Sequence, residues 1–300
     1  MRLVFFGTPD EGATVLDALV AAEHEVALVI TRPDARRSRR GTTEPSPVRV
    51  AAERLGLPVR TPPKTSEVVD ELRESGAAVG VVVAYGQILP RGVLEALPLG
   101  LVNMHFSLLP RWRGAAPVER AVLAGDAETG VAIMHLEEGL DTGPVFATAH
   151  TPIGDQETAG ELRGRLVDLG IDLLLDTLPQ LASVDPEPQQ GEPTYADKLS
   201  VEEFRLDPQR PAAELHRMVR AGSPRPGAWF VIDGRRVKVL TAHIEPSDDV
   251  TPGTIDDAAR LVTIDGGLAL DEVQPEGRRP MPGADWRRGI ATKDLALDAP

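Results

Sequence analysis

The sequence predicts an α/β fold with a mainly parallel sheet, followed by a smaller β-barrel domain. Apolar, β-prone segments alternate with segments of helical periodicity through the first two thirds of the chain. A polar stretch rich in proline follows, and after it come short β-prone segments separated by glycine and proline. At 300 residues the chain is long enough for two domains of ordinary size.

The first strand and helix are predicted at the N-terminus. Leu3–Phe6 is apolar and β-prone, Gly7–Pro9 is typical of a turn, and Val15, Leu16 and Leu19 recur at helical spacing. The same reasoning predicts further strands at Val26–Ile30, Ala78–Ala84, Leu101–His105, Val131–Leu136 and Val145–His150. It predicts helices at Pro47–Leu55, Ser66–Ser75 and Gln156–Leu181.

The boundary between the two domains is predicted near residue 184. Ser183–Glu192 is rich in Pro, Asp, Glu and Gln and cannot build a core, which is typical of a linker. We therefore expect domains at 1–184 and 206–300, joined by a linker at 185–205. The second domain is predicted to contain a helix at Pro211–Ala221 and strands at Ala228–Ile232, Val237–His243, Ala259–Ile264 and Gly267–Glu272.

Composition restricts the chemistry and the surroundings. The chain has no cysteine, so catalysis must rest on His, carboxylates, amides or hydroxyls. Its net charge of -14 argues against a general nucleic-acid binder, so a role with nucleic acid would need local basic patches. There is no apolar run long enough for a membrane span and no secretory signal, and we expect a monomer in the cytoplasm.

The strand predicted at Leu101–His105 carries the most informative polar residues. Side chains two residues apart on a strand point the same way, so Asn103, His105 and Ser107 are expected to share one face. Pro110 and Gly114 show that the chain leaves the sheet soon afterwards, which places the three residues at a strand's carboxyl end, where open α/β sheets bind ligands. A histidine between apolar residues is also compatible with a purely structural role.

Two further motifs favour catalysis. They are residues 107–117 (SLLPRWRGAAP) and 139–144 (GLDTGP). With the preceding Asn-x-His, this order resembles the folate-dependent formyltransferase family, and the resemblance implies that Asn103, His105 and Asp141 are catalytic. It extends to residues 6–9 (FGTP), 84–90 (AYGQILP) and 194–200 (TYADKLS), the last of which is similar to the members that act on methionyl-tRNA.

The predicted reaction requires these residue types. A neutral amine attacks a formyl carbon, and donors aimed at the formyl oxygen lower the barrier as negative charge develops. Asn103 can donate from its amide, His105 can act as acid or base, and Asp141 can orient the ring and stabilise its protonated form. Which group takes the proton of the amine stays open at this stage.

The resemblance also implies a cosubstrate, 10-formyltetrahydrofolate. The residues expected to contact the folate are Ser107, Leu108, Leu109 and Pro110, with a second wall from Tyr85, Gly86, Gln87, Ile88 and Leu89. Each apolar residue among them is also compatible with simple core packing. We expect no metal, because HExxH is absent and the six histidines show no ligand spacing; Walker A and GxGxxG are absent too.

A local basic segment is the main evidence for an RNA partner. Residues 32–41 hold five arginines against one aspartate in an otherwise acidic chain. By resemblance, such a basic insertion engages the acceptor stem of tRNA, which makes Arg36, Arg37, Arg39 and Arg40 candidates for tRNA binding. The family's OB-like second domain also contacts tRNA, and the basic pairs at 235–236, 278–279 and 287–288 are compatible with that role or with an ordinary surface.

The function implied is formyl transfer from 10-formyltetrahydrofolate to the amino group of methionyl initiator tRNA, for translation initiation. The same trio could instead direct an amino-sugar nucleotide or water at the formyl carbon, giving a sugar formyltransferase or a 10-formyltetrahydrofolate hydrolase. A non-catalytic RNA-binding protein that retains a Rossmann-like domain is the remaining alternative. Two departures from the family pattern, Glu11–Ala13 and the bulky Phe106, remove no catalytic group.

Overall fold

The computed structural model describes residues 1–36, 43–246, 251–290 and 295–298. These residues form two compact units. The N-terminal unit comprises Met1–Gly114, Thr129–Thr151 and Gly164–Tyr195. The C-terminal unit comprises Ala115–Glu128, Pro152–Arg163 and Ala196–Pro300. The domain limits drawn from the sequence at 184 and 206 stay a prediction.

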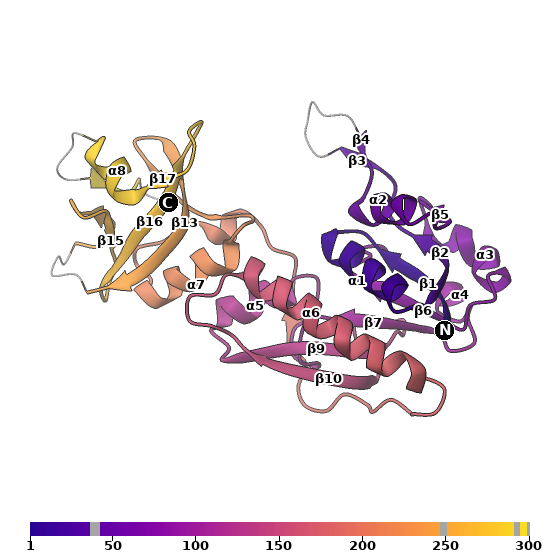
Figure 1. The fold of residues 1–300 in the computed structure, drawn as a ribbon. Coiled ribbons are helices and arrows are strands. Elements are labelled where there is room, and N and C mark those ends of the chain that lie inside the picture. The colour runs from indigo at the N-terminus through magenta and orange to yellow at the C-terminus, as the bar shows by residue number, and fades with distance from the viewer. Residues whose placement is uncertain (37–42, 247–250, 291–294, 299–300) are drawn as a thin grey trace. The chain divides into compact units, whose positions relative to one another are not determined.

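The N-terminal unit is built on a seven-stranded sheet with the strand order β10-β9-β7-β6-β1-β2-β5 (Figure 1). Its strands are β1 (Arg2–Gly7), β2 (Glu25–Ile30), β5 (Val59–Arg60), β6 (Val79–Val83), β7 (Leu101–His105), β9 (Glu128–His135) and β10 (Val145–Pro152). The pairs β1–β2, β1–β6, β2–β5 and β6–β7 are parallel, whereas β7–β9 is antiparallel. The prediction of a mainly parallel sheet is confirmed.

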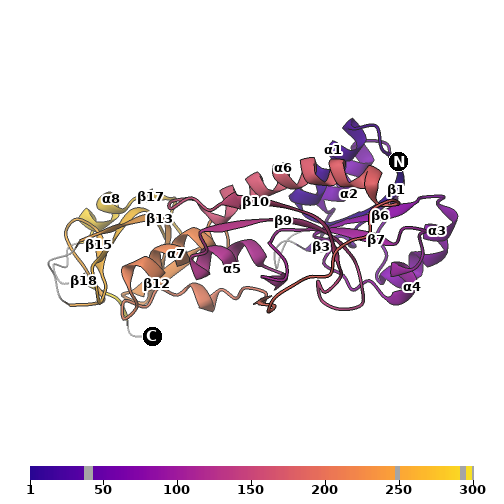
Figure 2. The same cartoon turned by 90° about the horizontal axis from the view of Figure 1, so that it is seen from below.

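Helices cover both faces of this sheet (Figure 2). On one face lie α1 (Asp10–Ala21) and α6 (Ala159–Thr177), and Gly170 of α6 packs so closely on Met104 of β7 that an added Cβ would lie 2.6 Å from its sulfur. On the other face lie α3 (Val69–Glu74) and α4 (Arg91–Leu94), where Phe6, Leu72 and Val93 belong to one buried cluster. Burial on both faces explains why the strand segments are almost continuously apolar.

Local sequence signals account for several helix ends. The helix α2 (Pro47–Arg54) starts where the Ser46 hydroxyl accepts a bond of 3.0 Å from the Arg49 amide, with Pro47 as its first residue. The helix α5 (Pro117–Ala124) also starts on proline and ends at Gly125, whose φ is 75°. The remaining short elements up to residue 204 are β3 (Ala35–Arg36), β4 (Thr43–Glu44), η1 (Thr65–Val68), β8 (Arg113–Gly114), η2 (Leu178–Gln180), β11 (Tyr195–Ala196) and η3 (Glu202–Phe204).

The C-terminal unit contains an antiparallel half-barrel with the strand order β12-β13-β16-β15-β14-β18, and β17 pairs with β16. Its strands are β12 (Ala228–Ile232), β13 (Arg235–Glu245), β14 (Thr254–Ile255), β15 (Arg260–Val262), β16 (Gly267–Pro275), β17 (Met281–Pro282) and β18 (Leu295–Ala296). Its last two helices are α7 (Ala212–Gly222) and α8 (Gly283–Arg288). The small β domain predicted after the parallel sheet is confirmed.

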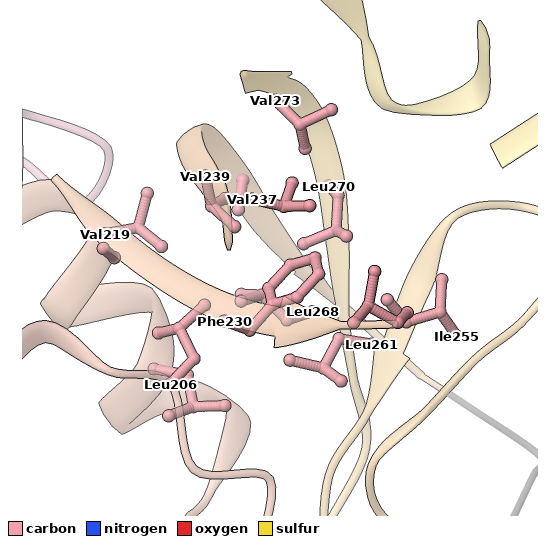
Figure 3. Close-up of a cluster of buried hydrophobic side chains, with 14 of the residues drawn as sticks. Leu206, Val219, Phe230, Val237, Val239, Ile255, Leu261, Leu268, Leu270 and Val273 are labelled. Carbon is pink, nitrogen blue, oxygen red and sulfur yellow. The ribbon is translucent and has the colours of Figure 1, made fainter. Parts of the chain in front are cut away.

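The core of this half-barrel is a continuous apolar cluster around Phe230 (Figure 3). Leu206, Val219, Leu261 and Leu268 are buried members of this cluster, and alternate residues of the strands supply most of the rest. Since most of these side chains come from strands and from α7, that helix and the sheet bury one common core. None of the helices in the described part of the chain combines the length with the apolar character that a membrane crossing requires.

His243 gives the half-barrel a stability that depends on pH. Hydrogen bonds to Asp271 and then to Glu245 raise the pKa of His243 above its ordinary value. Its contribution is therefore fully present below the unfolded pKa of about 6.5 and is lost as the pH rises through the folded pKa. Because the side chain is 43% exposed, the effect is small. We expect His243→Gln to lower Tm by about 1–3 °C more at about pH 5.5 than at about pH 8.5.

Thermal unfolding followed by circular dichroism at the two pH values measures this difference. The comparison within one variant cancels any packing change that glutamine introduces. An equal loss of Tm at both values would show that the charge of His243 contributes nothing.

Candidate active site

Two of the predicted catalytic side chains lie on one face of β7. Asn103 and His105 are two residues apart on this strand, and Met104 between them packs against α6 on the opposite face. In the sheet, Asn103 pairs with Val82 of β6 and with Met134 of β9. Neighbours on both sides fix the register, so both side chains are held at the carboxyl end of a central strand.

Ser107 departs from the predicted arrangement. β7 ends at His105, so Ser107 does not continue the face of Asn103 and His105. It is fully buried in the following turn, where its hydroxyl donates a bond of 2.6 Å to the Arg111 carbonyl. The alternation that predicted a shared face holds only while the backbone stays extended, and the chain bends immediately after the strand.

His105 is held by the backbone of the loop that follows. Its ring is 5% exposed, and Nε2 lies 2.9 Å from the carbonyl oxygen of Trp112. A carbonyl can only accept, so Nε2 carries the hydrogen and the neutral ring has its lone pair on Nδ1. Nδ1 lies 3.7 Å from Oδ2 of Asp141. The basic nitrogen of His105 thus faces the predicted third member of the trio.

Asp141 occupies a tight and strained turn. Its φ of 50° lies in the left-handed region, which a non-glycine residue adopts only where the surroundings impose it. Gly143 comes so close to His135 that an added Cβ would lie 1.8 Å from the His135 carbonyl oxygen. The Asp141 carboxylate accepts a bond of 2.8 Å from the Gly114 amide and is 13% exposed. Steric crowding therefore explains why position 143 of the DTG motif is glycine. The bond from the Gly114 amide fixes the Asp141 carboxylate.

The segment predicted to line the folate site has a buried and an exposed part. The Tyr85 ring is 2% exposed and meets Phe6 edge-on at 5.6 Å, and its hydroxyl lies 3.1 Å from the Thr65 hydroxyl. Burial raises the pKa of Tyr85, so it is a neutral packing residue. Gln87 donates a bond to the Pro62 carbonyl. Ile88, by contrast, is 88% exposed.

The other predicted folate residues surround the end of β7 or flank Tyr85. Leu108, Leu109 and Pro110 are half-buried, and so is Leu89, whereas Gly86 is exposed with a φ of 76°. Leu140, next to Asp141, is 61% exposed. Exposed apolar side chains thus stand on both the turn after β6 and the turn that carries Asp141.

Two residues that hold the site were not predicted. The Gln189 amide donates to the backbone carbonyls of Asp141 and Gly143, and the Thr194 hydroxyl accepts a bond of 2.9 Å from the Trp112 amide. Both come from the part of the chain predicted to be a linker. Its composition is typical of a linker, and the only signal pointing to Thr194 is the family-like run at 194–200.

The predicted tRNA-binding arginines fall mostly outside the described residues. Arg36 ends β3, where it pairs with Thr43 of β4. Arg37, Arg39 and Arg40 belong to the part of the chain that the structure does not describe. Their role stays a prediction.

The C-terminal unit has a basic cleft of about 550 Å³. Arg205, Arg236 and Lys238 line it together with Trp229, and Glu276 is the one acidic residue among its lining residues, all of which belong to the described part of the chain. The Arg236 guanidinium stacks 3.8 Å from the centroid of the Trp229 ring. Arg236 comes from one of the predicted basic pairs, and the cleft concentrates positive charge on an acidic protein.

Within the residues that the structure describes, His, Asp and Glu side chains nowhere gather in a group of three that could hold a metal ion.

Comparison with known proteins identifies both parts of the chain. The family described as Formyl transferase matches residues 1–178, and Formyl transferase, C-terminal domain, matches residues 198–291. The methionyl-tRNA formyltransferase of Paracoccus denitrificans is 48% identical over 297 residues, which cover 98% of this chain and 99% of the relative. That of Thermus thermophilus is 48% identical over 295 residues, which cover 96% of each chain.

A solved structure shares the fold at much lower identity. It is the N-formyltransferase of Helicobacter canadensis in complex with folinic acid and dTDP-3-aminofucose, with a TM-score of 0.66 and 17% identity over 89% of this chain and 97% of that one. At this identity the similarity concerns the fold alone. The two family matches and the 48% identity over nearly the whole chain show more than a shared fold: the chain belongs to the methionyl-tRNA formyltransferase family.

Proposed function

We propose that this chain transfers the formyl group of 10-formyltetrahydrofolate to the amino group of methionine on the initiator tRNA. The main observation behind this proposal is the arrangement of three side chains. Asn103 and His105 share one face of β7, and the Asp141 carboxylate lies 3.7 Å from the His105 ring. This arrangement supplies an oxyanion donor and a base supported by a carboxylate. Relatives that are 48% identical carry the same activity in their names, which supports the choice of substrate.

The residues around the trio suit a folate. Bound 10-formyltetrahydrofolate supplies the formyl carbon as the electrophile. Ile88 and Leu140 expose large apolar side chains on the turns beside the trio, and flat aromatic groups pack well on such surfaces. We propose that Ile88, Leu108, Leu109 and Pro110 contact the folate, while the buried Tyr85 and Ser107 support the wall from behind. Gly86, Gln87 and Leu89 complete the turn next to Tyr85.

Asn103 is proposed to stabilise the developing charge on the formyl oxygen. It lies two residues before the end of β7, its side chain is partly exposed, and its amide can donate towards a bound carbonyl. Such a donor acts mostly when the oxygen becomes negative, so it lowers the barrier more than it strengthens binding.

His105 and Asp141 are proposed to remove the proton of the amine. Because Nε2 is committed to the Trp112 carbonyl, Nδ1 is the nitrogen that can accept a proton. The Asp141 carboxylate faces that nitrogen and stabilises the resulting positive charge. As the nitrogen of the amine bonds to the formyl carbon, its proton passes to Nδ1, the bond from the formyl carbon to the folate nitrogen breaks, and that nitrogen takes up a proton to release tetrahydrofolate.

We further propose two surfaces for the tRNA. The first is the basic segment with Arg36, Arg37, Arg39 and Arg40, on the grounds of its charge alone. The second is the basic cleft of the C-terminal unit around Trp229. We also propose a catalytic domain at 1–184 and a second tRNA-contacting domain at 206–300, joined at 185–205, in an enzyme that acts as a monomer in the cytoplasm.

Replacing Arg36, Arg37, Arg39 and Arg40 together by alanine tests the first surface. We expect the catalytic efficiency with initiator methionyl-tRNA to fall about tenfold or more and its dependence on salt to become shallower, because fewer counterions are released on binding. We expect folate binding and Tm to stay nearly unchanged, because the segment has little apolar sequence that could be buried in a core. Steady-state kinetics at several salt concentrations measure the effect.

A matched control removes four arginines that are exposed in the described part of the chain, namely Arg54, Arg60, Arg73 and Arg91. It changes the net charge by the same amount at sites outside the segment. Equal losses in both quadruple variants would mean that only the net charge matters, and wild-type kinetics in the test variant would remove the segment from tRNA recognition.

The function itself is tested by offering the purified protein 10-formyltetrahydrofolate with three acceptors. These are initiator methionyl-tRNA, a nucleotide-linked amino sugar and water alone. We expect formylmethionyl-tRNA as the product. Formylation of the sugar would establish the sugar formyltransferase instead, release of formate without acceptor would establish a hydrolase, and the absence of all three would leave an RNA-binding protein.

A further inference from the structure

Gln189 makes four hydrogen bonds around the turn that carries Asp141. Its Nε2 donates bonds of 2.8 Å to the backbone carbonyls of Asp141 and of Gly143. Its Oε1 accepts bonds of 3.0 and 2.7 Å from Nε and Nη2 of Arg113. All these residues belong to the N-terminal unit. The two carbonyls flank the DTG turn, so one side chain spans it.

The partners of Gln189 leave its amide only one orientation. A guanidinium can only donate, and a backbone carbonyl can only accept, so Oε1 must face Arg113 and Nε2 must face the turn. Arg113 therefore sets the direction in which Gln189 donates. Replacing the amide by a carboxylate would keep the two bonds from Arg113 and remove both donations to the turn.

A second contact completes a closed ring of bonds. The amide of Gly114, the residue after Arg113, donates to the Asp141 carboxylate. The side chain of Asp141 is thus held directly by the backbone at residue 114, and its main chain is held through Gln189 by the side chain at residue 113. Since the φ of Asp141 is 50°, the turn needs such restraints to keep its shape.

The backbone near Gln189 is anchored without the help of its side chain. Glu187 and Val145 exchange two backbone hydrogen bonds of 2.7 and 2.8 Å. On the other side, the Thr194 carbonyl accepts a bond of 2.9 Å from the Arg113 amide. Substitutions of the Gln189 side chain should therefore change the turn at Asp141 while the segment stays in place.

We propose that Gln189 is a positioning residue for formyl transfer, which fixes the Asp141 carboxylate opposite Nδ1 of His105. This inference rests on the proposed function and on the role given there to the His105–Asp141 pair. Gln189 touches neither reacting group, so it acts through Asp141. Gln189 belongs to the segment 185–205 that was predicted to be a linker. Its side chain affects the rate because small displacements of a catalytic group lower the rate strongly.

The test uses Gln189→Glu, with Gln189→Met as a second, uncharged variant of similar length. The matched control is Gln190→Glu, which makes the same change of charge at the neighbouring, exposed position. In the full-length protein we expect both Gln189 variants to lower kcat about tenfold to a hundredfold, with the KM for folate and for tRNA changed less than about threefold. The control should keep wild-type kcat, and Tm should change little in all three.

A purely structural role is separated from positioning by the same substitution in an Asp141→Asn background. If Gln189 acts through the Asp141 carboxylate, Gln189→Glu causes no further loss once that carboxylate is gone. A further loss of the same factor, or wild-type kcat in both single Gln189 variants, would overturn the proposal. A wild-type protein without formyl transfer to methionyl-tRNA would instead refute the proposed function, and the inference with it.

Discussion

Replacement of His105 by alanine or glutamine is expected to lower kcat for formyl transfer about a hundredfold or more. Both variants lack a nitrogen that can accept a proton opposite Asp141, and glutamine retains an amide that can donate to the Trp112 carbonyl. Because His105 is 5% exposed, alanine also leaves a small cavity, so glutamine is the better variant for separating chemistry from stability. Single-turnover kinetics with saturating folate and methionyl-tRNA measure the chemical step.

The control for this experiment is His150→Gln, which alters an exposed histidine of β10. Its kcat should match that of the wild-type protein. Asp141→Asn should lower kcat by a similar factor as His105→Gln, and the double variant should lose little more, because the two groups act as a unit. Near-normal turnover in folded His105→Gln would exclude it as the base.

Part of the geometry of the proposed active site follows from local sequence. Asn103 and His105 share a strand face because the side-chain period of a strand depends only on nearest neighbours. Their place at a carboxyl end follows from Pro110 and Gly114, which show that the strand stops. Asp141 could be assigned only through the family resemblance, since no local rule brings a turn after β9 to the end of β7.

The groups that hold His105 and Asp141 in place could not be predicted from the sequence, for a physical reason. The Trp112 carbonyl and the Gly114 amide are backbone atoms, and every residue type offers them. Gln189 lies among prolines and acidic residues, a composition that is typical of a linker. Its role depends on tertiary pairing between Glu187 and Val145, which composition does not report.

The same limit applies to elements of the fold. The parallel sheet and the main strands of the half-barrel were predicted, because their apolar segments are long enough to show a period. α5 was not predicted, and β14, β17 and β18 have two residues each, too few to show a period. The predicted helix Gln156–Leu181 is shorter as α6, which passes into the turn η2 at Leu178 because Pro179 interrupts the helical hydrogen bonds.

Asn103→Ala is expected to lower kcat by about a hundredfold to a thousandfold, the loss typical of removing one oxyanion donor. The KM for folate should change much less, because the donor acts mainly when the formyl oxygen becomes negative. Asn103→Asp keeps the size of the side chain but turns the donor into a negatively charged acceptor. It should be at least as inactive as the alanine variant, since its charge opposes the charge that develops on the oxygen.

The two variants together distinguish a transition-state donor from a folate contact. Asn103 lies between Val82 and Met134 in the sheet, and its side chain is not part of the buried core, so neither substitution should disturb the strand. Tm and folate affinity, measured by calorimetry on each variant, verify this directly. If alanine raises the dissociation constant of the folate while kcat stays at the wild-type value, Asn103 binds the ground state and the oxyanion donor must be another group. If kcat falls in both variants and folate affinity is retained, the strand that carries His105 also carries the donor, and the two chemical tasks of the reaction are performed by side chains two residues apart on β7.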